Sequence, residues 1–503
     1  MTGRSIFRVL RWAGLAAVAP VLWACNARTL EAPTLKPSQV YTKPFQQSIN
    51  RNVDLLFLVD DSSSMRLSQD NLNRNFPVFM NTLMNSPQGL PNIHVAVISS
   101  DMGAGDGSVA SCDSTGGKQG IFQYTARGTC AATGLNAGAT YISNVLGQQN
   151  YTGNLADVFT CIAALGEQGC GFEHQFAAIT RALGVDGLGA APAENQGFLR
   201  SDAYLVIVLI TNEDDCSAQL GNGPNNRIPL FDTGSNTNMA SQLGPPANFR
   251  CNEFGHTCPT GVVGANRSVP HPDRNSPNLD VAAMVSYDNC ASDDSEGYLL
   301  SAADTANKIK SLKNDPGQVL VAAITGPATP YTVTWKAPSS TDTSCNANGT
   351  TCPWPVIAHS CTASDGSFAD PGVRIADFVS QFGANGLNLP ICATDFAPSL
   401  QRIGDLINAT LQPPCITQTI ATKANGNPDC TVVSHTQNNS GAYVDSVVSY
   451  CGDNGNAAPC WNLTAPMMPS AACPNTAQVI SISMDPNLPA STAQNATVSC
   501  ALQ

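Results

Sequence analysis

The sequence predicts an α/β fold with a doubly wound, mostly parallel sheet. Four runs are almost entirely apolar, as strands covered on both faces should be; they are residues 53–59, 93–98, 204–210 and 319–324. Stretches with the apolar spacing of amphipathic helices alternate with these strands. Alternating strands and helices build a parallel sheet, because a helical crossover returns the chain to the same edge.

The expected helices follow the 3.6-residue period. One apolar stripe runs from Leu72 to Leu83 and contains Pro77, which predicts a kink. Similar stripes lie at residues 176–183, 299–312, 375–382 and 396–411. The last two helices close the α/β domain, and Pro413, Pro414 and Cys415 mark its boundary.

Length and composition restrict the class of protein. A chain of 503 residues exceeds one ordinary domain, and its 43% apolar content excludes general disorder. The formal net charge of −13 argues against a nucleic-acid binder, which would present a basic face.

The first residues have the pattern of a secretory signal. Residues 1–24 contain three arginines, no acidic residue and an apolar run too short to span a bilayer. They end in Leu-Trp-Ala-Cys, which resembles a bacterial lipobox with Cys25 as the lipidated residue; the alternative is ordinary cleavage after Ala24. Asn26 favours the outer membrane, with the protein held by its lipid anchor. Loss of the three arginines takes the formal charge from −13 to −16.

The remaining chain divides into a tether and two folded parts. Residues 25–50 are expected to be a lipidated Cys and a flexible tether. Residues 51–411 form the α/β domain, interrupted by Cys-bearing insertions at about 217–297 and 326–370. Residues 412–503 are expected to form a small Cys-rich β module.

Two regions lack helical stripes. Residues 101–150 are Gly-rich and are expected to form a long loop with a hairpin at the sheet edge. In the C-terminal module, β-like runs lie at residues 443–450 and 479–483.

The cysteines indicate an oxidising compartment. There are nineteen, with no Cys-x-x-Cys pair, which argues against zinc ribbons and thioredoxin-type sites. If Cys25 is lipidated, eighteen remain for up to nine disulfides. The sequence does not determine their pairing, but close neighbours are candidate partners: Cys251 with Cys258, Cys345 with Cys352, and Cys451 with Cys460.

One motif indicates binding chemistry. The strand at 53–59 runs into Asp60-Asp61-Ser62-Ser63-Ser64, an Asp-x-Ser-x-Ser pattern just before a helix. One carboxylate and two hydroxyls on alternate residues of a turn can face a single hard cation such as Mg²⁺. Ligands of open α/β sheets bind at the carboxyl ends of strands, where this motif lies.

The motif and the order of the apolar strands resemble a von Willebrand factor type A domain, over roughly residues 50–411. Cys-rich bacterial surface lipoproteins of this type are the nearest likeness. The resemblance implies a doubly wound sheet with one antiparallel edge strand and a metal-ion-dependent adhesion site. It implies that Asp60, Ser62 and Ser64 are metal ligands and that an acidic side chain of a protein partner completes the coordination.

The sequence departs from the family pattern at two places. The family usually supplies a Thr before a later helix, where this chain has Glu173 as the best oxygen donor. The family also has Thr-Asp-Gly after the strand at 204–210, where this chain has Thr211-Asn212-Glu213 followed by Asp214. We expect Asn212 or Asp214 to replace the usual Asp and Glu173 to restore the negative charge. Extra carboxylates and looser geometry make Ca²⁺ an alternative to Mg²⁺.

Each of these residues has a simpler reading. Asp60 and the serines after it are also good caps for the first helix. Glu173 is also a carboxylate favoured by the dipole in the first turn of a helix. Residues 213–215 are also consistent with a solvated acidic loop.

The expected function is non-enzymatic binding. A lipid-anchored domain with a metal site would capture an acidic group on a protein partner, as an adhesin or as part of a surface assembly. One alternative is an envelope protein whose metal only stabilises the fold. The other is a metal-dependent hydrolase using Asp60 and residues 213–215, which lacks an evident general base or nucleophile pair.

Overall fold

The protein is described here by a computed structural model. The structure describes residues 51–85, 89–104, 112, 116–128, 130–145, 147–218, 229–231, 243, 249–258, 284–336, 354–411, 415–437, 443–453, 455–466, 473–483 and 494–502. The expected signal peptide, Cys25 and the tether lie outside the described residues. Within the described part of the chain, no helix is both long and apolar enough to cross a membrane.

A seven-stranded sheet forms the centre of the α/β part, in the order β14-β9-β5-β1-β2-β3-β4. Five neighbouring strands are parallel: β1 (Asn52–Val59), β2 (Asn92–Ser99), β5 (Tyr204–Ile210), β9 (Val319–Thr325) and β14 (Gly386–Pro390). The antiparallel strands β3 (Ile142–Val145) and β4 (Gln148–Gln149) complete one edge. The four predicted strands and the edge hairpin are confirmed, whereas β14 was not predicted.

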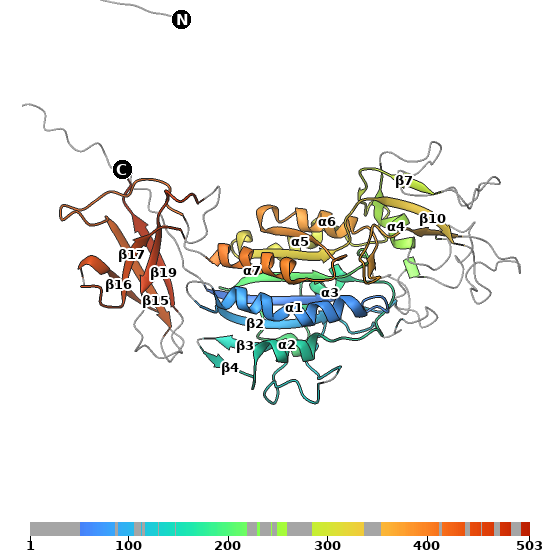
Figure 1. The fold of residues 1–503 in the computed structure, drawn as a ribbon, viewed down its shortest axis with the longest axis horizontal. Helices are drawn as coiled ribbons and strands as arrows, with labels where there is room; N and C mark the ends of the chain where they lie inside the picture. Colours follow the sequence, from blue (N-terminus) through green and yellow to red (C-terminus); the bar gives the residue numbers. More distant parts are fainter. Residues whose placement is uncertain are drawn as a thin grey trace, which may run out of the picture. The chain divides into compact units, whose positions relative to one another are not determined.

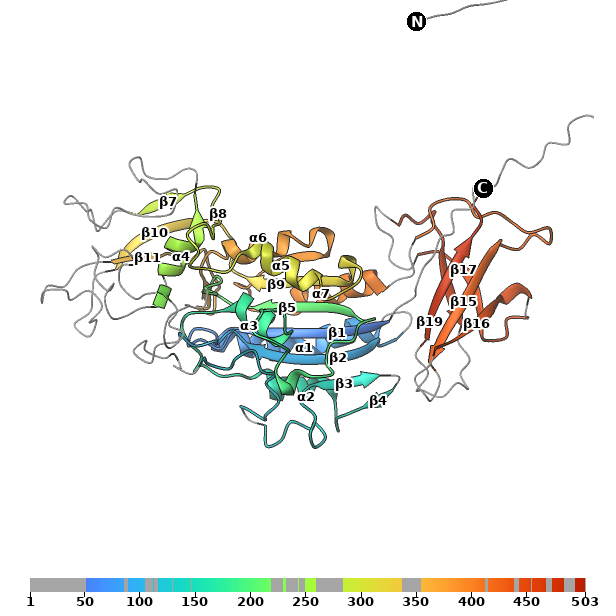
Figure 2. The ribbon, with the colours of Figure 1, turned by 180° about the vertical axis from the view of Figure 1, so that it is seen from behind.

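Helices cover both faces of this sheet (Figures 1 and 2). On one face, Phe57 of β1 contacts Phe76 and Phe159, with ring centroids 5.7 and 4.8 Å away. The helices of this face are α1 (Arg66–Met84), α2 (Leu155–Ala163) and α7 (Ala397–Leu411). On the other face, Phe176 and Phe378 lie 4.8 Å apart; its helices are α3 (Gln175–Ala182), α5 (Ala302–Lys310) and α6 (Val373–Ser380).

The predicted insertions contain secondary structure of their own. A three-stranded antiparallel sheet joins the two insertions, in the order β11-β10-β7. Its strands are β7 (Val285–Tyr287), β10 (Tyr331–Lys336) and β11 (Trp354–Ile357). The described parts also contain short elements: the 3-10 helix η2 (Pro229–Phe231), α4 (Phe249–Gly255), β6 (His256–Thr257), β8 (Ala291–Ser292), β12 (Cys361–Thr362) and β13 (Phe368–Ala369).

Disulfides staple these segments. The expected pair of Cys451 and Cys460 is confirmed. The expected pair of Cys251 and Cys258 is wrong, because Cys251 joins Cys216 and Cys258 joins Cys290. The physical reason is that β6 pairs antiparallel with β8, Thr257 opposite Ala291, so the next residues, Cys258 and Cys290, come together. Cys345 and Cys352 lie outside the described residues. The other disulfides are Cys112–Cys170, Cys130–Cys161, Cys361–Cys392, Cys415–Cys473 and Cys430–Cys500.

The C-terminal region contains a five-stranded sheet in the order β18-β17-β16-β15-β19. Its strands are β15 (Cys430–Gln437), β16 (Tyr443–Tyr450), β17 (Cys460–Thr464), β18 (Val479–Ser483) and β19 (Gln494–Cys500). The two strands predicted in this region, β16 and β18, are confirmed. A small compact unit contains residues 418–430 and 500–502, in which Ile420 pairs with Leu502.

Candidate functional site

Asp60 lies at the carboxyl end of the central strand β1, and its backbone N–H bonds to the carbonyl of Ile210 at the end of β5. Its side chain is 0% exposed. One carboxylate oxygen accepts a hydrogen bond from the Ser62 N–H (2.8 Å), and the other accepts one from the Thr211 hydroxyl (2.7 Å). Burial raises the pKa of Asp60 to about 6. The carboxylate is therefore held by neutral donors in a dry setting.

Three further predicted residues lie together at this edge. The hydroxyl oxygens of Ser62 and Ser64 are 3.3 Å apart. The side-chain amide of Asn212 contacts the Ser64 hydroxyl through both Nδ2 (3.0 Å) and Oδ1 (3.2 Å). The structure thus brings carboxylate, hydroxyl and amide oxygens from the ends of β1 and β5 into one hydrogen-bonded group. The alternative that Asp60 and the serines cap the first helix is wrong. Met65 occupies the N-cap position of α1, and no side-chain hydrogen bond caps this helix.

Glu173 lies beside this group, in the loop before α3. Its side chain is buried, and its Oε1 atom has no hydrogen-bond partner among the described residues. Burial first, and then the charges of Glu213 and Asp60, raise the pKa of Glu173 well above its ordinary value. Glu173 precedes His174, the residue that caps α3, so it lies outside the first helical turn.

Glu213 was not among the predicted ligands. Glu213 lines the same pocket as Glu173, its charge raises the pKa of Glu173, and its backbone N–H bonds to the Thr211 hydroxyl. Glu213 is two residues beyond Thr211, which contacts Asp60. Its neighbour Glu173 lies on a distant segment, so no local sequence pattern identifies Glu213.

Asp214 has a different set of partners. One oxygen accepts hydrogen bonds from His256 Nε2 and the Arg374 N–H, both at 2.8 Å, and the other accepts one from the Ile375 N–H at 3.1 Å. The structure therefore places this predicted ligand at the start of α6 beside His256. Its oxygens satisfy the first backbone N–H groups of that helix.

Asp215 anchors the neighbouring helix in the same way. It accepts a hydrogen bond from the Phe176 N–H at the start of α3 (2.9 Å) and pairs with the Arg374 guanidinium (3.1 Å). Both Asp214 and Asp215 are buried. The alternative of a solvated acidic loop is therefore wrong for these two residues.

The basic side chains near the site pair with acidic residues other than Asp60 and Glu173. Lys118 pairs with Asp61, the residue after Asp60, and also lies 3.7 Å from Asp101. Arg374 pairs with Asp215. In the described part of the chain, Asp60 and Glu173 form no such pair with a basic side chain. The carboxyl groups of Asp60 and Glu173 thus have no ion-pair partner among the described residues.

Two disulfides hold the loops that carry the glutamates. Cys170, three residues before Glu173, joins Cys112, and Cys216, three residues after Glu213, joins Cys251. The Cys216 N–H also bonds to the Glu173 carbonyl at 2.7 Å, which connects the loops directly. Side chains from both loops line a small pocket: Glu173, Glu213, Asp214, Asp215 and Cys216.

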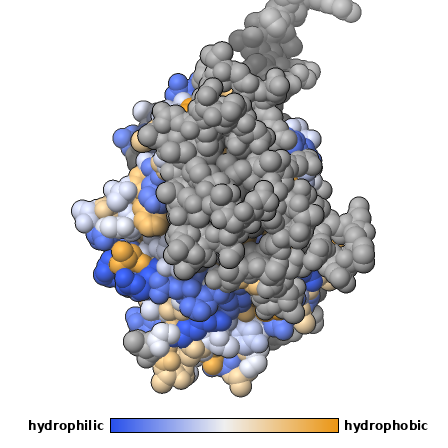
Figure 3. Space-filling view, turned by 90° about the vertical axis from the view of Figure 1, so that its right-hand side faces the viewer, coloured by the Kyte–Doolittle hydropathy of each residue, from blue (hydrophilic) through white to orange (hydrophobic). Residues whose placement is uncertain are grey.

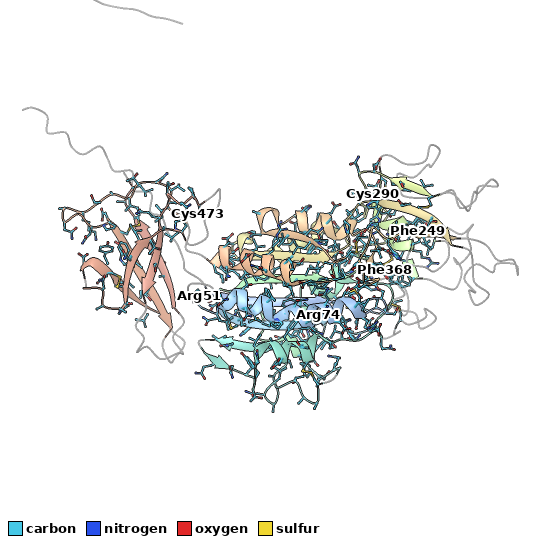
Figure 4. The ribbon with its side chains drawn as sticks, in the orientation of Figure 1. Arg51, Arg74, Phe249, Cys290, Phe368 and Cys473 are labelled. Atoms are coloured by element: carbon cyan, nitrogen blue, oxygen red, sulfur yellow. A yellow bond between two sulfur atoms is a disulfide. The ribbon has the colours of Figure 1, made fainter. Side chains whose placement is uncertain are left out.

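The described residues visible at this end of the α/β part include both hydrophilic and hydrophobic ones (Figure 3). Figure 4 shows Phe368 and Phe249 toward the insertions, away from Arg51, which precedes β1.

The grouped donors fit a hard cation. Asp60, Ser62, Ser64 and Asn212 offer only oxygen as ligand atoms, the type that Mg²⁺ and Ca²⁺ prefer. The unpartnered Oε1 of Glu173 adds a carboxylate oxygen nearby. No group of three Asp, Glu, His or Cys side chains among the described residues is arranged to hold an ion by itself. Any cation here would therefore depend on hydroxyl and amide oxygens as well as carboxylates.

Comparisons with known proteins identify no family. No protein-family model matches the chain, and no curated protein matches it. Among solved structures, the chain is similar to the pilus adhesin SpaC from Lactobacillus rhamnosus GG, with 12% identity and a TM-score of 0.26. The match covers 90% of this chain and 39% of the adhesin. A similarity this low supports no conclusion about fold or function.

Proposed function

We propose that the chain is a cation-dependent binding module of the von Willebrand factor type A kind. The observation that carries this proposal is the buried Asp60 carboxylate, whose hydrogen bonds from described residues come from neutral donors, together with a buried Glu173 oxygen that has no hydrogen-bond partner there. Burying uncompensated carboxylates costs free energy unless a cation pairs with them. A divalent ion at the end of β1 would supply that charge.

The topology supports the same assignment. Five parallel strands carry helices on both faces, and an antiparallel hairpin occupies one edge. We propose that this is the doubly wound arrangement that the sequence resemblance implies. Asp60 follows the central strand of the sheet, where such folds bind their ligands.

In the proposed site, Asp60, Ser62 and Ser64 hold Mg²⁺ or Ca²⁺ from β1, and Asn212 contributes from β5. The bound ion supplies a Lewis-acidic position that an acidic side chain of a partner protein can fill. Asp214 contributes indirectly, because its contacts with α6 and His256 fix the loop after β5. No step of covalent chemistry is part of this proposal.

The disulfides and Cys25 support the cellular compartment that we propose. Disulfides are typical of secreted and envelope proteins, and the structure contains eight between described residues. We propose that Cys25 is lipidated and anchors the protein in the outer membrane of a bacterium. The role would be adhesion or assembly at the cell surface.

Capture of partners from envelope extracts tests this function. The native chain should capture a protein in Mg²⁺ or Ca²⁺ and release it in EDTA, whereas Asp60→Ala should not capture it. Asp70→Ala is the matched control, because Asp70 is exposed on α1 and pairs with Arg66 at the surface. Cation-independent capture by both variants would favour a purely structural role.

A further inference from the structure

The side chain of Asn212 is fixed from two sides. Its Nδ2 atom donates hydrogen bonds to the Ser64 hydroxyl (3.0 Å) and to the backbone carbonyl of Phe368 (3.1 Å). The backbone carbonyl of Asn212 accepts a hydrogen bond from the Asp370 N–H at 2.9 Å. Asn212 is 2% exposed, so water does not compete for these contacts. The hairpin β12–β13 thus holds both the main chain and the side chain of Asn212.

The Phe368 carbonyl is itself held in place. The ring of Phe368 stacks on His359 at 3.9 Å, and His359 Nδ1 bonds to Asp370 at 2.7 Å. The disulfide Cys361–Cys392 ties the base of the hairpin to the segment after β14. Phe368 is labelled in Figure 4 at the end of the α/β part that carries the insertions.

The Phe368 carbonyl determines which kind of side-chain atom residue 212 can place next to it. It only accepts hydrogen bonds, so the side-chain atom about 3 Å away must be a donor. An amide meets this requirement and turns its Oδ1 atom toward Ser64. A carboxylate would place two acceptors against each other in a buried setting, which is strongly unfavourable. The end of β5 is therefore restricted to a neutral residue.

Negative charge is found on other segments instead. Glu173, in the loop before α3, and Glu213 line the same small pocket, and the charges of Glu213 and Asp60 both act on the Glu173 carboxyl group. The disulfides at Cys170 and Cys216 and the hydrogen bond from Cys216 to the Glu173 carbonyl fix both glutamates. The unpartnered Oε1 of Glu173 is the atom that a cation would satisfy.

We propose that the pair Glu173 and Glu213 supplies the second negative charge of the cation site, and that the residue after β5 does not. Asn212 is then a neutral ligand that the Phe368 carbonyl positions, and Glu213 belongs to the site. This inference rests on the proposed cation site and adds which residues set its charge.

The test is Ca²⁺ and Mg²⁺ titration calorimetry on the chain from residue 26 onward, with its disulfides intact. Glu173→Gln should weaken cation binding about tenfold or more, because loss of an ion's charged neighbour typically costs that much. Asn212→Asp should also weaken binding, although it adds a negative charge. The double variant E173Q/N212D has the native formal charge and should stay as weak as E173Q.

The control is Asn408→Asp. Asn408 is also buried, and its Nδ2 donates to one main-chain carbonyl, that of Thr82, between α7 and α1. It should leave cation affinity unchanged. If N212D does not fold, the cation affinities of Glu213→Gln and Asn212→Ala test the proposal instead. E213Q should lose more cation affinity than N212A.

Contrary results are separable. Tighter cation binding by N212D, or recovery of cation affinity in E173Q/N212D, would contradict the proposal that Glu173 and Glu213 supply the second negative charge. The cation site itself would still stand. A native chain that binds neither Ca²⁺ nor Mg²⁺ would instead overturn the proposed function on which the inference rests.

Discussion

The hydroxyl of Thr211 donates a 2.7 Å hydrogen bond to the carboxylate of Asp60 and so joins the ends of the neighbouring strands β5 and β1. The same hydroxyl accepts a hydrogen bond from Gln175 Nε2 at the start of α3. The position of Asp60 therefore depends on two segments far from it in sequence. This dependence leads to the first prediction.

Thr211→Val should weaken Ca²⁺ binding about tenfold, because it removes the donor that orients Asp60 while keeping the size of the side chain. Without cation, the variant should also lose about 1–3 kcal/mol of stability, since a buried carboxylate oxygen loses its partner. Calorimetry and urea unfolding measure the two effects. Thr160→Val is the control, because the Thr160 hydroxyl bonds within α2. Equal cation affinities for the native chain and T211V would exclude this role for Thr211.

The disulfide Cys216–Cys251 should be required for tight cation binding. The variant C216S/C251S frees the loop that carries Glu213, so its Ca²⁺ affinity should fall at least about tenfold. Its free energy of unfolding should fall by roughly 3 kcal/mol. The variant C451S/C460S removes a disulfide of the C-terminal region, and its Ca²⁺ affinity should equal that of the native chain. The same loss in both variants would indicate general unfolding.

His94 should make the native chain lose stability as the pH falls. Burial, followed by the charge of Arg200, lowers the pKa of His94 to about 4. In the unfolded chain its pKa is about 6.5, so the unfolded state binds the proton first. Stability from His94 is complete above about pH 6.5 and declines toward pH 4, by roughly 3 kcal/mol. Urea unfolding of His94→Gln should show a shallower decline over this range.

Asp54, opposite His94 in the register of β1 and β2, should have the reverse effect. Burial raises the pKa of Asp54 to about 6, against about 3.9 when unfolded. Its contribution to stability is therefore complete below about pH 3.9 and is lost as the pH rises through 6. Asp54→Asn should make the acid-side loss of stability steeper than in the native chain. A pH profile identical to the native one in both variants would contradict these two assignments.

The sequence predicts the elements that rely on local pattern. The strands β1, β2, β5 and β9 are continuous apolar runs that are buried on both faces. β14 was missed because Gly386–Pro390 is short and mixes polar with apolar residues. The three-stranded sheet of the insertions was missed because its pairing joins β7 and β10 across a long stretch of chain.

For the site, too, the sequence identifies residues that share one local motif but not residues whose partners are distant in sequence. Asp60, Ser62 and Ser64 lie in one turn, so their motif identifies them together. The partners of Asp214 are His256, 42 residues away, and Arg374, 160 residues away. No local pattern reveals such partners, which is why Asp214 and Glu213 could not be told apart from sequence.

Thermal unfolding with and without divalent cation tests the central claim most directly. A bound ion stabilises only the folded chain, by about 2.7 kcal/mol at one hundred times its dissociation constant. The account predicts that Ca²⁺ or Mg²⁺ raises the unfolding temperature of the native chain, that EDTA reverses the rise, and that Asp60→Ala shows neither effect. An identical unfolding temperature for the native chain in cation and in EDTA would contradict a cation site at Asp60.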